Sequence, residues 1–105
     1  MKMVVLGAVL VLAQDRLGDP AWGHELARRF CGECHVVEPG DLEPGGAEGA
    51  LPFQAIADDP ATTEFALRIF LRLPHGERPL PRLTPDETDD LVAYLLSLKG
   101  DGSDQ

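Results

Sequence analysis

The 105-residue chain has little positive charge, few cysteines and no apolar run long enough to cross a membrane. Nine lysines and arginines stand against 18 aspartates and glutamates, which gives a formal net charge of −9. This balance argues against nucleic acid and anionic membrane surfaces as partners, because both are negatively charged. Two interpretations remain for the acidity. It either steers a protein partner with a basic docking surface, or simply keeps a small exported domain soluble.

The longest apolar run lies near the N-terminus, where Met3 to Ala13 follows the charge of Lys2. These 11 residues are too few for a hydrocarbon core, which needs about 20. A short positive start, an apolar stretch and a following polar break are typical of an export signal. We therefore predict a signal peptide over 1–13 and one mature domain over 14–105, located in the periplasm without a membrane span. A buried N-terminal strand and an uncleaved anchor are the alternatives.

Only two cysteines occur, Cys31 and Cys34, and His35 follows the second directly. A zinc site of four cysteines is therefore excluded. A site of two cysteines and two histidines is disfavoured as well, because His24 and His75 lack the required spacing. The spacing C-x-x-C-H is instead that of covalent c-type haem attachment. A redox-active thiol pair is the remaining alternative, but such a pair normally follows a strand in a βαβ frame, and no such frame is evident.

The chemistry of haem attachment explains this spacing. One turn of chain places the thiols of Cys31 and Cys34 under the two vinyl groups of a haem, where each forms a thioether bond. The imidazole of the next residue, His35, then lies beneath the iron as its proximal ligand. The sequence thus predicts one covalent haem c.

The first predicted helix runs from Trp22 to Phe30. Asp19-Pro20 provides a cap and a proline in the first turn. Trp22, Leu26 and Phe30 recur at helical spacing and predict its apolar face. Gly23 lies within this helix, which indicates that another backbone approaches closely.

Two further helical segments are expected after a long loop. Phe53 to Ala57 could form one short turn. A longer helix starts near Asp59-Pro60 or Thr62 and stops at Pro74. Its expected apolar face is made of the following residues: Phe65, Leu67, Ile69, Phe70, Leu71 and Leu73.

The last helix has the clearest boundaries. Thr84-Pro85-Asp86-Glu87 is a capping box with proline at the first helical position, and Gly100 is the expected stop. Its apolar residues are Leu91, Val92, Leu95, Leu96 and Leu98. No strand pattern or repeat appears, so the predicted fold class is all-α.

Two segments rich in glycine and proline separate these helices. Loops as long as residues 36–52 are usually functional in a compact domain, and we expect this one to wrap around the edge of the haem. Residues 74–83 form the second loop, which contains His75.

With these features the chain resembles the monohaem class I cytochromes c, from about Gly18 to Lys99. The resemblance implies a small all-α domain wrapped around one covalently attached haem, with electron transfer rather than enzymatic turnover as its activity. Gly23 matches the small residue at which the N-terminal helix crosses the C-terminal one, where Leu91 and Tyr94 face it. Pro52 or its neighbour matches the loop position whose carbonyl accepts a hydrogen bond from the proximal histidine.

A bacterial periplasmic subgroup of these cytochromes is especially similar, and it shows what this chain lacks. That subgroup places a Met-Pro pair before the C-terminal helix, and the methionine sulfur is the sixth iron ligand. The only methionines here are Met1 and Met3. Arg78-Pro79 occupies the Met-Pro position by spacing, while Leu80-Pro81 is the best match by residue character. Neither arginine nor leucine can bind iron.

The sequence therefore does not decide the identity of the sixth ligand. His75 lies in the loop that the resemblance places on the distal side, and it is one candidate. An open or water-occupied site is the second possibility. Lys99 is disfavoured as a ligand, because it lies at the far end of a helix. His24 lies on the helix that leads into the proximal motif, so we expect a surface histidine beside Trp22.

Two functions follow from these options. The first is a periplasmic electron carrier, or the small electron-transfer subunit of an oxidoreductase, with a redox protein as partner. The second is a haem-based sensor or binder of small ligands such as carbon monoxide and nitric oxide, which requires an open distal site.

Overall fold

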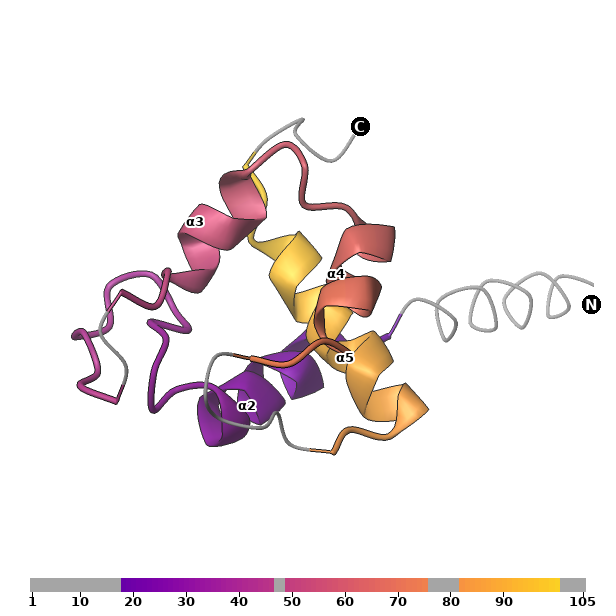
Figure 1. Ribbon diagram of the computed structural model, residues 1–105, viewed down its shortest axis with the longest axis horizontal. Helices are drawn as coiled ribbons and strands as arrows, with labels where there is room; N and C mark the ends of the chain where they lie inside the picture. Colours follow the sequence, from indigo (N-terminus) through magenta and orange to yellow (C-terminus); the bar gives the residue numbers. More distant parts are fainter. Residues whose placement is uncertain (1–17, 47–48, 76–81, 101–105) are drawn as a thin grey trace, which may run out of the picture.

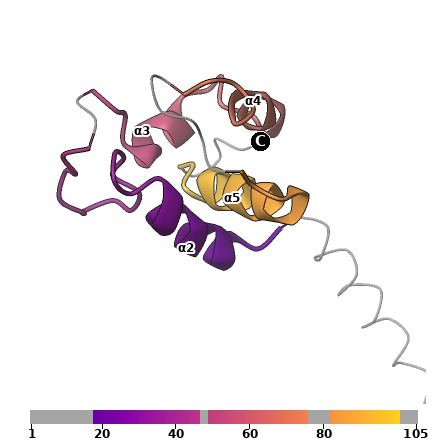
Figure 2. The same ribbon diagram turned by 60° about the horizontal axis from the view of Figure 1, so that its bottom comes forward.

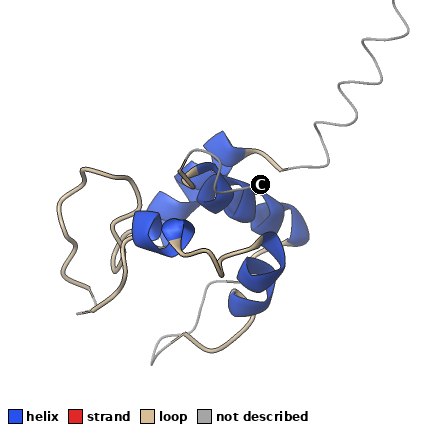
Figure 3. Ribbon diagram, turned by 90° about the horizontal axis from the view of Figure 1, so that it is seen from above, coloured by secondary structure: helices blue, strands red, loops and turns tan. Residues whose placement is uncertain are grey.

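A computed structural model of the chain describes residues 18–46, 49–75 and 82–100. Within these ranges it consists of helices and loops without a β-sheet, so the predicted all-α class is confirmed (Figure 3). The helices are α2 (Pro20–Phe30), α3 (Phe53–Asp58), α4 (Glu64–Phe70) and α5 (Pro85–Ser97). None of the helices in these ranges is long and apolar enough to cross a membrane. The predicted signal peptide, residues 1–13, lies outside the described residues.

Helix α5 is the centre of the arrangement. Helix α2 crosses it on one side, and α3 and α4 lie on the other (Figures 1 and 2). Among the described helices, α2, α3 and α4 each pack against α5 but not against one another. The hydrophobic core is consequently small, as expected for a chain of this size.

The crossing of α2 and α5 occurs at Gly23, as the resemblance implied. A Cβ atom at this position would overlap the backbone carbonyl of Asp90 and would lie 3.0 Å from the Cβ of Tyr94. Leu91 and Tyr94 are both buried in this contact region of α5. Only a residue without a side chain allows the two backbones to approach this closely, which offsets the cost of a glycine inside a helix.

Local capping chemistry determines where the best-defined helices begin. The carboxylate of Asp19 accepts hydrogen bonds from the amides of Ala21 and Trp22 at the start of α2. At the start of α5, Thr84 and Glu87 form the predicted capping box, with bonds of 3.1 and 2.9 Å. These two predictions are therefore confirmed.

Both predicted boundaries of α4 and the predicted end of α5 were wrong. Helix α4 begins only at Glu64, because the hydroxyl of Thr63 caps it by accepting from the amide of Ala66. It ends at Phe70, several residues before Pro74. Helix α5 ends at Ser97, with Leu98 still in a right-handed conformation, so Gly100 does not form its C-cap.

Two predicted apolar faces were also wrong in their extent. In α2 the buried face is formed by Gly23, Leu26 and Ala27, whereas Trp22 and Phe30 remain 44% and 45% exposed. In α4 only Leu67 is buried. A helix with one protein partner buries a narrow face, and its remaining apolar residues need another surface to cover them. The exposed apolar residues of α4 and the turn after it are Phe65, Ile69, Phe70 and Leu73.

Polar contacts fix α3 and α4 on α5. The side-chain amide of Gln54 donates to the carbonyl of Leu98 at 2.6 Å, and Lys99 Nζ donates to the carbonyl of Ala57 at 2.9 Å. On α4, Arg68 pairs with Asp89 at 2.8 Å. The contacts of α3 thereby hold the loop that precedes this helix in a defined position.

Candidate functional site

The C-x-x-C-H motif forms the turn that follows α2. The amide of Cys31 still donates to the carbonyl of Ala27 at 2.8 Å, which completes the last turn of the helix. The amides of Cys34 and His35 then both donate to the carbonyl of Cys31, at 3.1 and 2.9 Å. One turn of backbone thus brings the two thiols and the imidazole together, as the spacing predicted.

Neither cysteine forms a disulfide, and the environment of Cys31 opposes ionisation. Burial raises the pKa of Cys31 to about 11, with a smaller contribution from the nearby charge of Cys34. Redox-active cysteines of the thioredoxin kind have a lowered pKa, because the thiolate is the reactive form. This observation argues against the thiol-redox alternative.

A backbone carbonyl orients the ring of His35. The Nδ1 atom lies 2.6 Å from the carbonyl oxygen of Leu51, the neighbour of Pro52. Since a carbonyl oxygen only accepts, Nδ1 carries the proton, and in the neutral ring Nε2 then keeps its lone pair. The expectation that Pro52 or its neighbour accepts this bond is confirmed. The free Nε2 is the form of imidazole that binds a metal, and the bond at Nδ1 fixes the ring orientation.

Two contacts around the motif were not foreseen from the sequence. The ring of Phe53 packs against the ring of His35, with centroids 5.1 Å apart. The amide of Gly46 donates to the carbonyl of Glu33 at 2.9 Å, and a Cβ at Gly46 would overlap that carbonyl and lie 3.1 Å from Cys34 Sγ. The Gly45-Gly46 pair was the available signal, because paired glycines often mark a close approach of two backbones.

The loop expected to wrap around a haem edge returns to the motif. The amide of Phe53 donates to the carbonyl of Val36 at 2.9 Å, which closes the loop between them. Residues 47–48 of this loop lie outside the described ranges.

The structure places His75 beside His35. The two ring centroids are 5.9 Å apart, with an angle of 42° between the ring planes. Phe70 contacts His75 edge-on, with centroids 5.8 Å apart. His75 is half-buried. The segment 76–81, which includes Arg78, lies outside the described residues.

The prediction for His24 was wrong in its neighbour. The side chain remains 31% exposed, but its ring stacks on Tyr94 of α5 rather than lying beside Trp22, with centroids 4.7 Å apart. Its Nε2 lies 3.1 Å from a carboxylate oxygen of Glu38, although the two atoms are not aligned as in a hydrogen bond. The sequence could not show this contact, because Tyr94 is far along the chain and reaches His24 only through the α2–α5 crossing.

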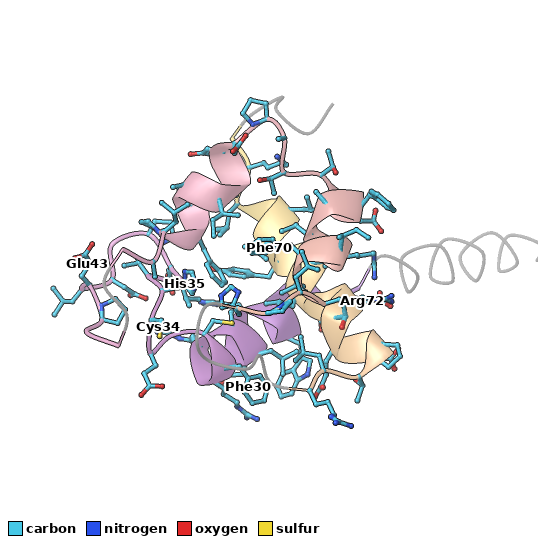
Figure 4. The ribbon with its side chains drawn as sticks, in the orientation of Figure 1. Phe30, Cys34, His35, Glu43, Phe70 and Arg72 are labelled. Carbon is cyan, nitrogen blue, oxygen red and sulfur yellow. The ribbon has the colours of Figure 1, made fainter. Side chains whose placement is uncertain are left out.

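The surroundings of His35 suit a flat apolar cofactor. Figure 4 shows His35 in the middle of the molecule, with Phe30 and Cys34 on one side of it and Phe70 on the other in this view. Among the large apolar side chains that are exposed in the described part of the chain, Phe70 packs against His75, which lies beside His35. A haem at this place would cover exposed apolar surface of this kind. The exposed residues are Trp22, Phe30, Leu42, Leu51, Phe65, Ile69, Phe70 and Leu73. The cysteines, the oriented imidazole and this apolar surface therefore fit a covalently bound haem.

Comparison with known proteins agrees with this chemistry. The chain is 35% identical to cytochrome c-552 of Bradyrhizobium diazoefficiens over an alignment of 106 positions, which covers 94% of this chain and 99% of that protein. No protein-family model matches the chain, and no solved structure gives a significant match.

Proposed function

Because the chain belongs to the class I c-type cytochromes, which carry covalent haem c and transfer electrons, we propose that Cys31, Cys34 and His35 bind its haem. The two cysteines form the thioether bonds, and His35 Nε2 is the proximal iron ligand. The observation that carries this proposal is the hydrogen bond from His35 Nδ1 to the carbonyl of Leu51, because it leaves Nε2 free and fixes the ring beside the two thiols.

When bound, haem supplies a one-electron ferric–ferrous couple. The chain's residues control how that couple is used. Covalent attachment retains the cofactor, which a thin core with little buried apolar area would hold weakly by packing alone. Leu51 and Phe53 hold the proximal ring in one orientation. A haem beside His35 would cover exposed apolar surface such as Phe70, which packs against His75.

The cellular role is a soluble exported electron carrier, or the small subunit of an oxidoreductase complex, in the periplasm. The apolar segment after Lys2 supports export. The net charge of −9 supports a redox partner with a basic docking surface, because opposite charges accelerate association. The alternative role as a binder of small ligands requires an open distal site, and the position of His75 near His35 favours the carrier.

Haem staining after denaturing electrophoresis tests the assignment of the attachment residues. We expect protein matured with haem to stain strongly. Cys31→Ala and Cys34→Ala should each stain weakly, and the double variant should not stain. His24→Ala is the matched control and should stain normally, because its ring packs on Tyr94 rather than beside the cysteines. Full staining of the double variant would contradict the proposal.

Cell fractionation and salt dependence test the cellular role. The haem protein should appear in the periplasmic fraction. Its rate of electron exchange with a basic redox protein should fall as ionic strength rises, because salt screens the attraction. Retention in the cytoplasm, or exchange that is independent of salt, would contradict the corresponding part of the role.

A further inference from the structure

We propose that His75 is the sixth ligand of the haem iron, so that two imidazoles hold the metal from opposite sides. The inference rests on the proposed function, namely that a haem is attached at Cys31 and Cys34 with His35 as its proximal ligand. It also accounts for how a chain without a methionine in its mature domain completes the coordination of a cytochrome iron.

The separation of the two rings is the main argument. An imidazole nitrogen lies about 2 Å from a first-row metal, and the ring centre lies about 1 Å behind that nitrogen, so two imidazoles on one iron have centres about 6 Å apart. The centroids of His35 and His75 are 5.9 Å apart. This value agrees with the distance that a shared iron requires.

Neighbouring residues hold His75 at this distance. Phe70 packs edge-on against its ring at 5.8 Å. Between these two residues the chain turns back after α4, where the amides of Arg72 and Leu73 donate to the carbonyls of Ile69 and Phe70. Because α4 is itself fixed on α5 by the pair of Arg68 and Asp89 at 2.8 Å, the position of His75 follows from the fold.

The proximal ring is prepared for the same iron. The carbonyl of Leu51 holds the proton of His35 on Nδ1, so the lone pair of Nε2 is available on the other side of the ring. His75 is half-buried and lies close to that ring. The two imidazoles thus come from segments before α3 and after α4, as expected when one flat cofactor lies between them.

The other side chains able to bind iron lie elsewhere. His24 stacks on Tyr94 and approaches Glu38. Lys99 donates to the carbonyl of Ala57 at the far end of α5. Met1 and Met3 belong to the predicted signal peptide. In the described part of the mature chain, His75 is therefore the available partner for His35.

The ferrous visible spectrum of the matured protein tests this assignment. We expect the wild-type protein to be low-spin in both oxidation states and to change little when carbon monoxide is added, because both axial positions are filled. His75→Ala should become high-spin when reduced and should bind carbon monoxide readily. Added imidazole should return the ferric form of this variant to a low-spin spectrum, which shows that the fold survived and that only a ligand was lost.

His24→Ala is the matched control, because it removes the other histidine outside the motif and should leave the spectrum unchanged. A wild-type ferrous form that is already high-spin, or a His75→Ala protein that remains low-spin, would overturn the inference. Haem staining of the same samples distinguishes the two levels of failure. Covalent haem with an open or differently filled sixth site contradicts only the role of His75, whereas the absence of covalent haem contradicts the proposed function as well.

Discussion

The hydroxyl of Tyr94 donates a 2.7 Å hydrogen bond to the backbone carbonyl of Val37, two residues after the predicted proximal ligand. This bond is buried and joins α5 to the segment that leaves the C-x-x-C-H motif. The ring of Tyr94 also stacks on His24, so one side chain connects α2, α5 and the motif. Burial raises the pKa of this tyrosine, and the nearby carboxylates of Glu38 and Asp41 add to the shift, so the hydroxyl remains a donor at neutral pH.

The first prediction concerns this hydroxyl. Tyr94→Phe should lower the free energy of unfolding by about 1–3 kcal/mol, because the carbonyl of Val37 would be left buried without its donor. Denaturant unfolding of the haem-loaded protein measures the change. The control is Ser97→Ala, which removes an exposed hydroxyl that bonds only within its own helix. It should alter stability by less than about 0.5 kcal/mol. Equal effects of the two variants would contradict this role of Tyr94.

The second prediction concerns the helix crossing. Gly23→Ala should lower the free energy of unfolding by about 1–3 kcal/mol. The new Cβ overlaps the carbonyl of Asp90 and must force α2 and α5 apart. Thermal unfolding provides the measurement. Gly45→Ala is the matched control, since a Cβ there meets no atom within 4 Å. A Gly23→Ala protein as stable as this control would show that the helices do not depend on close approach.

The third prediction concerns the iron. Its reduction potential should lie below that of a cytochrome c with histidine and methionine ligands measured in the same buffer, because methionine ligation raises the potential. The ferric protein should also lack the near-infrared band that marks sulfur ligation, since the mature domain contains no methionine. Potentiometric titration and ferric spectra check both points. A sulfur-ligated spectrum would contradict the predicted loss of methionine ligation.

Local chemistry explains which parts of the fold could be predicted. Asp19 and Thr84 bond amides within their own helices, so both helix starts could be read from a few adjacent residues. The motif is equally local, because one turn of backbone sets the relation of Cys31 to His35. The bond from His35 to the loop carbonyl was foreseen only through family resemblance, since Leu51 is distant along the chain.

Apolar periodicity was less informative about what would be buried. Phe65 and Ile69 recur at helical spacing, yet they are 74% and 45% exposed. Periodicity identifies an apolar face but not the surface that covers it, and α4 has only α5 as a protein partner among the described helices. A haem supplies such a surface in this family. The contact of His24 with Tyr94 could not be predicted for a related reason, because it exists only after two distant helices have crossed.

Peptide mapping of the matured protein tests the central claim most directly. Trypsin cleaves after Arg29 and next after Arg68, so one fragment, residues 30–68, contains the whole motif. We predict that this fragment carries the mass of one haem and absorbs visible light, and that neither Cys31 nor Cys34 reacts with a thiol reagent. A colourless fragment of unmodified mass, with two free thiols or a disulfide between them, would contradict the account.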